Sequence, residues 1–178
     1  MNDFVIQLVL LTIILIIFGT AAYASYRAAP WLPVRKKDLR RIVESAQIGP
    51  HDVVYDLGSG DGRVVIAFAR LSNARVVGFD ISLLPYVYSR LRMLVSGLWR
   101  RVEIRFTDFF NADLSPATVV FCFLTPMAMR KLAPKFMSEL HAGVRIISYS
   151  FSIPGWTAER IDKPHQDSIP IFVYRKQK

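Results

Sequence analysis

The chain of 178 residues contains a single cysteine, Cys122, and only three histidines. One cysteine cannot form an internal disulfide, and no cysteine or histidine stands at the spacing of zinc ligands. The sequence therefore excludes a disulfide framework, gives no support to a bound metal, and fits a reducing compartment. The length suffices for one globular domain with an appendage, but hardly for two domains.

Ionisable charge is missing from the run between Phe4 and Ala24, apart from one tyrosine. A helix of about 20 apolar residues crosses a hydrocarbon core of ~30 Å, so this run predicts a transmembrane helix. Residues 22–24 also resemble the cleavage site of a signal peptide, but no lysine or arginine precedes the run, and the run is longer than a usual signal-peptide core. We therefore expect a membrane anchor over residues 1–26.

Basic residues are concentrated directly after this apolar run. The net charge of +9 suits nucleic acid, anionic lipid or an acidic protein, and charge alone does not choose among them. The cations between the run and residue 41 are Arg27, Arg35, Lys36, Lys37, Arg40 and Arg41. By the positive-inside rule they place the rest of the chain in the cytoplasm, or on the matrix side of a mitochondrial inner membrane. The cluster can be a topology signal alone or can also contact lipid headgroups. Residues 27–50 are thus expected to form a basic linker and a helix that precedes the domain.

Short β-branched runs alternate with helical stretches in the remainder of the chain. The patterns predict strands at 53–57, 76–80, 102–106, 118–124, 144–150 and 171–174, and helices at 39–46, 63–71, 84–98 and 128–140. The first strands are apolar nearly throughout, as in parallel strands that are covered on both faces. Residues 156–162 and 169–175 are joined by too short a segment for a crossover helix and should pair antiparallel. We expect residues 51–178 to form an α/β domain, a doubly wound, mostly parallel seven-strand sheet with an antiparallel C-terminal hairpin.

A glycine-rich loop, Asp56-Leu57-Gly58-Ser59-Gly60-Asp61-Gly62, stands between the strand at 53–57 and the next helix. Glycines serve where the backbone must turn tightly and let a ligand approach. A second acid, Asp80, lies 18 positions after Gly62 at the end of the next strand, where a carboxylate can accept ribose hydroxyls. A third, Asp108, follows the third strand and can meet an adenine amino group. The predicted cofactor-binding residues are Asp56, Gly58, Ser59, Gly60, Asp61, Gly62, Asp80, Ile81, Asp108 and Phe109.

The acids in and around this loop distinguish between two classes of nucleoside cofactor. Carboxylates repel the pyrophosphate of a dinucleotide, whereas the sulfonium and ammonium groups of S-adenosylmethionine favour them. The G-x-G-x-G spacing also differs from the dinucleotide pattern G-x-G-x-x-G. Acids that only cap helices and turns explain any one of these positions, but explain the set poorly. The sequence therefore predicts a Rossmann-like methyltransferase fold that binds S-adenosyl-L-methionine.

These motifs resemble those of the seven-strand lysine methyltransferases that modify the mitochondrial ATP synthase c-subunit and the adenine nucleotide translocase, and of their prokaryotic relatives. The segment 30–33 resembles the family's P-x-V-P element, with Leu32 in place of valine, and the loop 56–63 resembles its glycine loop. Residues 88–90, Asp108 and 151–156 also match. Asp80 stands where the mitochondrial members carry glutamate, and residues 123–126 differ from theirs, which leaves the substrate open. The resemblance implies a protein-lysine N-methyltransferase.

Methyl transfer from a sulfonium is an in-line displacement, so the protein mainly has to align and desolvate the reactants. No catalytic base is indicated, although a lysine acceptor must first lose its proton, which an apolar channel promotes. The candidate channel residues follow the fourth strand and are Phe123, Thr125 and Pro126. Phe123 can equally be a core residue, and Cys122 should point to the core. Trp156 fits packing beneath the hairpin as well as it fits substrate contact.

The resulting hypothesis is a membrane-anchored methyltransferase, single-pass, that acts on a lysine of a membrane-associated protein. The alternative is an enzyme acting on a lipid headgroup or a membrane-embedded small molecule. Nucleic acid is disfavoured as a partner because no [ND]-P-P-[YFW] stretch follows the fourth strand. A cofactor-binding module without activity is disfavoured because the loop acids are all present. Neither the membrane system nor the oligomeric state follows from the sequence.

Overall fold

The computed structural model describes residues 3–177, so the first two residues of the predicted anchor and the last residue of the predicted domain lie outside the described residues. An N-terminal helix, α1 (Asp3–Arg27), is followed by a short 3-10 turn, η1 (Lys36–Asp38), and by α2 (Leu39–Ala46). The remaining helices are α3 (Arg63–Ser72), α4 (Leu83–Val95) and α5 (Pro126–Glu139). The strands are β1 (Val53–Leu57), β2 (Arg75–Asp80), β3 (Val102–Phe106), β4 (Val119–Cys122), β5 (Arg145–Tyr149), β6 (Arg160–Asp162) and β7 (Ile171–Arg175).

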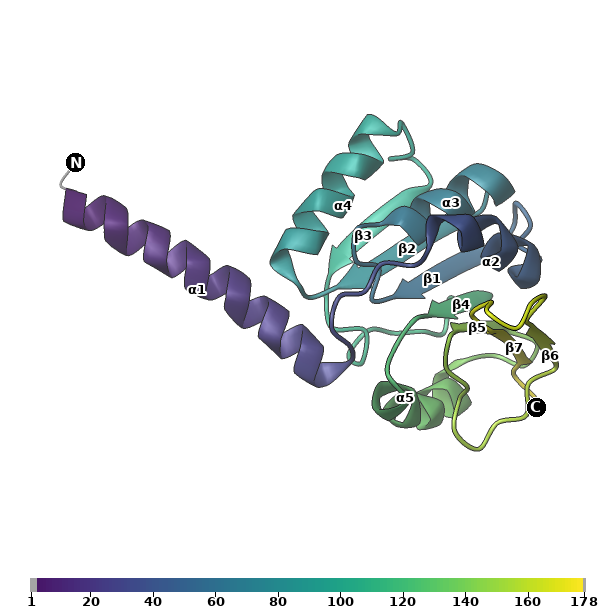
Figure 1. Cartoon of the computed structure of the whole chain (residues 1–178). Helices are drawn as coiled ribbons and strands as arrows, with labels where there is room; N and C mark the ends of the chain where they lie inside the picture. The colour runs from purple at the N-terminus through teal and green to yellow at the C-terminus, as the bar shows by residue number, and fades with distance from the viewer. Residues whose placement is uncertain (1–2, 178) are drawn as a thin grey trace.

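The strands form one seven-stranded sheet in the order β3-β2-β1-β4-β5-β7-β6 (Figure 1). The neighbours from β3 to β5 are parallel, whereas β7 runs antiparallel to β5 and to β6. This confirms the doubly wound, mostly parallel sheet with an antiparallel C-terminal hairpin. The strand order reverses at β1, which has β2 on one side and β4 on the other, and open α/β sheets bind ligands at such a point.

The hairpin strand predicted at 156–162 is wrong in its extent, because β6 contains only Arg160–Asp162. Trp156 turns inward instead of continuing the strand, and its ring stands edge-on to both Phe136 and Tyr174 at centroid distances of 6.4 and 6.1 Å. The indole therefore packs beneath the hairpin, which was one of the two roles considered for it.

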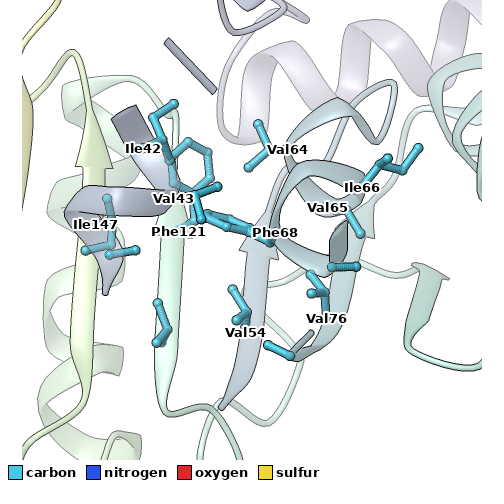
Figure 2. Packing of buried hydrophobic residues seen from close by; sticks show 14 of the residues in the cluster. Ile42, Val43, Val54, Val64, Val65, Ile66, Phe68, Val76, Phe121 and Ile147 are labelled. Carbon is cyan, nitrogen blue, oxygen red and sulfur yellow. The ribbon is translucent and has the colours of Figure 1, made fainter. Parts of the chain in front are cut away.

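Helices cover both faces of the sheet and enclose two apolar clusters. Figure 2 shows the first, where α2 and α3 pack on the sheet and Phe68 stands edge-on to Phe121 of β4, with ring centroids 5.7 Å apart. The second lies under α5 and includes Leu132, Phe136 and the buried Cys122. Burial on both faces explains why the parallel strands are apolar nearly throughout, and it confirms Cys122 as a core residue.

The predicted helix ends differ from the observed ones where local capping was overlooked. The helix α5 begins two residues before position 128, because the Thr125 hydroxyl accepts a hydrogen bond from Ala128 N and Pro126 occupies the first turn. The helix α4 ends at Val95 rather than at 98, and Gly97 follows with a left-handed φ of 71°. The bounds predicted for α2 agree with the structure.

The helix α1 projects away from the domain (Figure 1) and has no buried residue. It is long and apolar enough to cross a membrane, a property that a signal sequence shares. Near its C-terminal end it meets the start of α4, where Leu83 N donates to the Thr20 hydroxyl at 3.2 Å.

Candidate functional site

A pocket opens at the carboxyl ends of β1, β2 and β4, next to the point where the strand order reverses. All predicted cofactor residues except Gly62 line it: Asp56, Gly58, Ser59, Gly60, Asp61, Asp80, Ile81, Asp108 and Phe109. Its other walls come from the end of β4 and from residues 24–34, the segment that joins α1 to the domain. The topology therefore brings together side chains that are far apart in the sequence.

The glycine loop takes a backbone conformation that side-chain-bearing residues rarely adopt. Gly58, Gly60 and Gly62 have φ values of 88°, 53° and 74°, a region in which a Cβ atom is strained. Gly58 N and Ser59 N both donate to the Phe79 carbonyl, at 3.0 and 2.8 Å, and so fix the loop to β2. Gly62 begins α3 behind the loop rather than facing the pocket.

Gly78 of β2 is a supporting residue that the sequence reasoning missed. A Cβ at this position would lie 2.7 Å from the Cβ of Ser59, so only glycine lets the loop pack so closely on the strand. A glycine in the middle of an apolar strand often marks such a close approach, and this signal was present in the sequence.

Asp80 holds the glycine loop from the end of β2. Its two carboxylate oxygens accept hydrogen bonds from Gly60 N at 2.8 Å and from Ser82 N at 2.7 Å. Burial raises the pKa of Asp80, and these backbone hydrogen bonds oppose that increase. The carboxylate also lines the pocket, where it can accept a ligand hydroxyl.

Asp56 lies at the bottom of the pocket, buried near two other carboxylates. Burial raises its pKa well above the ordinary value of 3.8, and the nearby carboxylates of Asp80 and Asp61 raise it further. Among residues 3–177, the buried side-chain atoms without a hydrogen-bond partner are Asp56 Oδ2 and Ser59 Oγ. Buried polar atoms are rarely left unpaired, and a cationic, hydrogen-bonding ligand in the pocket can satisfy both.

Asp61 has a different role from its neighbours because two arginines neutralise it. Burial alone would raise its pKa, but hydrogen bonds from Arg63 outweigh that effect and lower the pKa. Arg92 of α4 also contacts this carboxylate at 3.0 Å. Arg63 in turn donates to the Val34 carbonyl at 2.8 Å and thereby ties the loop to the joining segment.

Asp108, predicted to face adenine, is paired with Arg27 at the end of α1. The guanidinium donates from Nε and Nη2 to Asp108 Oδ2 at 3.0 and 2.7 Å, and it lies 5.0 Å from the ring centre of Phe110. Asp108 Oδ1 accepts from Phe110 N at 3.0 Å. The sequence indicated a topology or lipid-contact role for Arg27 and not this ion pair, because a contact over 81 positions leaves no local pattern.

Residues 24–34 form a cover over the pocket, and we call them the joining segment. Trp31 lies against the glycine loop so closely that a Cβ on Gly60 would be 2.8 Å from its Nε1 atom. The Thr125 hydroxyl lies 2.5 Å from the Ala28 carbonyl and donates to it. The segment predicted as a linker is thus part of the wall of the site.

Phe123 is the one acceptor-channel candidate whose side chain lines the pocket. Its ring also stands edge-on to Tyr149, with centroids 5.0 Å apart, so it serves the core and the pocket together. Thr125 and Pro126 are described by the structure but are not part of the lining, since they form the start of α5. With Phe121 and Leu124, Phe123 makes the wall near β4 apolar.

A family model described as the ANTKMT methyltransferase domain matches residues 56–160. The chain belongs to this family. A protein-lysine N-methyltransferase of Saccharolobus islandicus is 35% identical over 146 residues, which cover 82% of this chain and 91% of that protein. The human lysine N-methyltransferase of the ATP synthase c-subunit is 29% identical over 140 residues, 79% of this chain but 59% of its own length. The chain thus spans about three fifths of that relative.

A solved structure of an RNA methyltransferase from Salinibacter ruber, in complex with S-adenosyl-L-homocysteine, superimposes with a TM-score of 0.79. It is 34% identical and covers 83% of this chain and 95% of its own. Together with the family, this similarity makes the chain a methyltransferase that depends on S-adenosyl-L-methionine. The residues present fit this cofactor: its cationic methionine end is complementary to the unpaired Asp56 carboxylate, and the glycines allow the left-handed backbone turns of the loop that lines the pocket.

Proposed function

We propose that the protein is a membrane-anchored protein-lysine N-methyltransferase that acts on a membrane-associated protein. The observation that carries this proposal is the position of the joining segment, which includes the last turn of the apolar α1 and forms a wall of the cofactor pocket. A pocket built in this way lies next to the bilayer when α1 spans it. The lysine specificity is supported by the S. islandicus relative and by the lysine N-methyltransferases of the ATP synthase c-subunit.

Each acid of the pocket has a distinct part in this proposal. Asp56 faces the ammonium and sulfonium groups of the cofactor, and Asp80 accepts the ribose hydroxyls while it holds Gly60. Asp108 stands at the adenine end, with Phe109 and Ile81 beside the base. Asp61 keeps the loop in shape through its arginine partners. The cofactor supplies the methyl group as a sulfonium, so no side chain has to act as a nucleophile.

The apolar wall formed by Phe121, Phe123 and Leu124 prepares the acceptor. A lysine that enters between these side chains loses part of its hydration, which disfavours the ammonium and lowers the lysine pKa. The neutral amine can then approach the methyl group in line. In this proposal the protein contributes alignment and exclusion of water rather than a base.

The domain organisation follows from the same proposal: an anchor at 1–26, a basic juxtamembrane region at 27–50 and the catalytic domain at 51–178. Arg27 and Arg41 are engaged inside the protein by Asp108, Asp38 and Asp162. The exposed cations of this region are Arg35, Lys36, Lys37 and Arg40. They are available to anionic headgroups and keep the catalytic domain on the cytoplasmic side, or on the matrix side in mitochondria.

RNA is the second candidate acceptor, because the similar solved structure from S. ruber is an RNA methyltransferase and the net charge is +9. A lipid headgroup is a third, on the strength of the proposed anchor. The three acceptors differ in the fraction of a cell extract in which a transferred methyl group is found.

The test is to incubate the full-length protein with methyl-labelled S-adenosylmethionine and an extract of membranes and RNA from cells that lack its gene. The label should be recovered in protein, as methylated lysine after hydrolysis and as methyl-sized mass steps in peptides. Asp56→Asn serves as the matched control, because it keeps the shape of the side chain but removes its charge. Label in RNA would support the second candidate, and label in lipid would support the third. Either result would contradict lysine methylation.

A further inference from the structure

The helix α4 carries its apolar stripe on the outside of the molecule. The exposed apolar residues of this helix recur at helical spacing and are Leu84, Val87, Tyr88, Leu91, Leu94 and Val95. Exposed fractions reach 56% at Leu91 and 90% at Val95. A surface helix of a soluble domain normally turns such a stripe toward the core, so the orientation of α4 is the reverse of the usual one.

The inward face of α4 carries fewer large apolar side chains and more polar ones. Ser89 and Met93 are its buried residues, and Tyr86 packs on Phe106 of β3 with ring centroids 5.1 Å apart. Arg92 contacts Asp61 of the glycine loop, and the Cβ of Ser89 approaches Gly62. The helix is therefore fixed to the cofactor loop through this face and cannot roll its apolar stripe inward.

The position of α4 relative to α1 indicates what covers the stripe. The helix α4 forms the side of the domain that faces the projecting part of α1, and in Figure 1 it runs across the direction of α1. The two helices meet where Leu83 N donates to the Thr20 hydroxyl. If α1 spans a bilayer from Phe4 to about this point, α4 lies in the plane of the membrane surface at the end of the span.

Basic and aromatic residues beside the stripe also suit a membrane surface. Arg90 on α4 and Arg100 after it are exposed, and Arg100 lies over the ring of the exposed Trp99 with 4.9 Å to its centroid. Arginine near anionic headgroups and tryptophan at the interface are typical of helices that lie in a membrane surface. An apolar stripe with a basic and aromatic edge is complementary to an anionic bilayer.

We propose that α4 is an interfacial helix whose outer face, Leu84 to Val95 with Trp99, inserts into the lipid surface beside the anchor. This inference rests on the proposed membrane attachment through α1 and adds a second contact, which fixes the orientation of the domain. Because α4 also packs against the glycine loop, insertion of α4 into the lipid surface holds the cofactor pocket at the bilayer, with the joining segment between pocket and bilayer.

The full-length protein offers a direct test, because its one cysteine is buried and a nitroxide can be attached to a single introduced cysteine. Leu91→Cys and Val95→Cys probe the stripe, Leu10→Cys probes the anchor, and the exposed Met137→Cys on α5 is the matched control on the opposite face of the sheet. Each labelled protein is placed in vesicles of phosphatidylcholine and phosphatidylglycerol, and its binding of S-adenosylhomocysteine verifies the fold. Collision rates with oxygen and with a water-soluble nickel chelate then report whether each label lies in lipid or in water.

The proposal expects the ratio of oxygen to nickel collisions at Leu91 and Val95 to exceed that at Met137 several-fold, and the ratio at Leu10 to be high as well. A high ratio at Leu10 with ratios at Leu91 and Val95 equal to the control would overturn the interfacial helix while leaving the anchor intact. Shielding of Leu91 and Val95 from both reagents would show a protein partner or a second copy on this face, and would also overturn it. A low ratio at Leu10 would refute the anchor and the interfacial helix together.

Discussion

Asp56 is the residue whose charge most directly connects the pocket to its cofactor. Its pKa is raised because it is buried near two other carboxylates, and a bound cation stabilises the ionised form. Asp56→Asn should therefore weaken binding of S-adenosylhomocysteine, which retains the ammonium group, by about 10-fold to 100-fold, as expected for loss of a charge-assisted hydrogen bond. Wild-type affinity should fall as the pH is lowered through the raised pKa, whereas the variant should lack this dependence. Calorimetric titration at several pH values measures both, and an unchanged affinity in the variant would remove Asp56 from the cofactor site.

The same substitution should make the ligand-free protein more stable. A carboxyl group whose pKa is raised by folding destabilises the folded state at pH values above the ordinary pKa of 3.8, and this cost grows as the pH rises toward the raised pKa. Asparagine carries no such cost. Thermal unfolding at neutral pH should give a higher Tm for Asp56→Asn than for the wild type, and the difference should shrink as the pH approaches 3.8. A lower Tm at neutral pH would show that the carboxylate is already balanced in the pocket.

Trp31 lies over the glycine loop, and we predict that it limits the access of a ligand to Gly60. Its indole lies against Gly60, so it has to move before the backbone of the loop can meet a ligand, and the need for a minor open state slows association. Trp31→Ala should raise the association rate of S-adenosylhomocysteine several-fold in stopped-flow measurements. Trp99→Ala, which removes an exposed indole away from the pocket, provides the control. Equal association rates for wild type and Trp31→Ala would mean that the indole does not gate the site.

At the scale of elements, Thr125 connects the start of α5 to the joining segment. Its hydroxyl accepts from Ala128 N and donates to the Ala28 carbonyl. Thr125→Ala should lower the free energy of unfolding by about 1 kcal/mol through loss of the helix cap, and Thr125→Ser should restore most of it. Denaturant unfolding measures the difference. If serine and alanine destabilise the protein equally, the Thr125 hydroxyl does not stabilise the start of α5 or its contact with Ala28.

The elements that could be predicted from the sequence are those whose signal is local. Apolar runs indicated the parallel strands, and the glycine loop with Asp80 pointed to the strand ends at which the pocket opens. The start of α5 was missed although its signal, Thr125 before Pro126, is local. The short β6 was missed because the inward turn of Trp156 depends on contacts with α5 and β7. Periodicity likewise indicates that α4 is a helix, but does not tell which of its faces the sheet covers.

The residues of the site that were missed depend on contacts between distant parts of the chain. In the sequence, Arg27 is one cation of the basic cluster after the apolar run. In the structure it pairs with the carboxylate of Asp108, 81 positions away. The role of Gly78 could have been predicted from the sequence, because a glycine inside an apolar strand signals a close approach of another backbone segment. Trp31 was noted as part of a family motif, and only the folded chain places its indole on Gly60.

At the scale of the whole molecule, residues 24–34 cover the pocket at the carboxyl ends of the strands, α1 projects from there, and the start of α4 contacts α1 (Figure 1). If α1 spans a bilayer as proposed, this arrangement restricts the substrates that the pocket can meet. Acceptors in or on the membrane would then reach the pocket directly, whereas soluble acceptors would have to enter between the domain and the bilayer. Selectivity then comes from geometry and local concentration in addition to side-chain contacts.

Deletion of residues 1–26 tests this restriction while it leaves Arg27 and its partner Asp108 in place. Affinity for S-adenosylhomocysteine should stay nearly unchanged, because the pocket lining lost with the anchor is Ala24 and the acids and glycines remain. Methylation of the membrane acceptor should fall by about 10²-fold or more, since tethering raises the effective concentration of a membrane-bound partner by such factors. A soluble peptide that carries the acceptor lysine is the control and should be methylated at similar rates by both proteins. If the truncated enzyme instead modifies the membrane acceptor at an undiminished rate, α1 determines where the protein resides but not what it methylates.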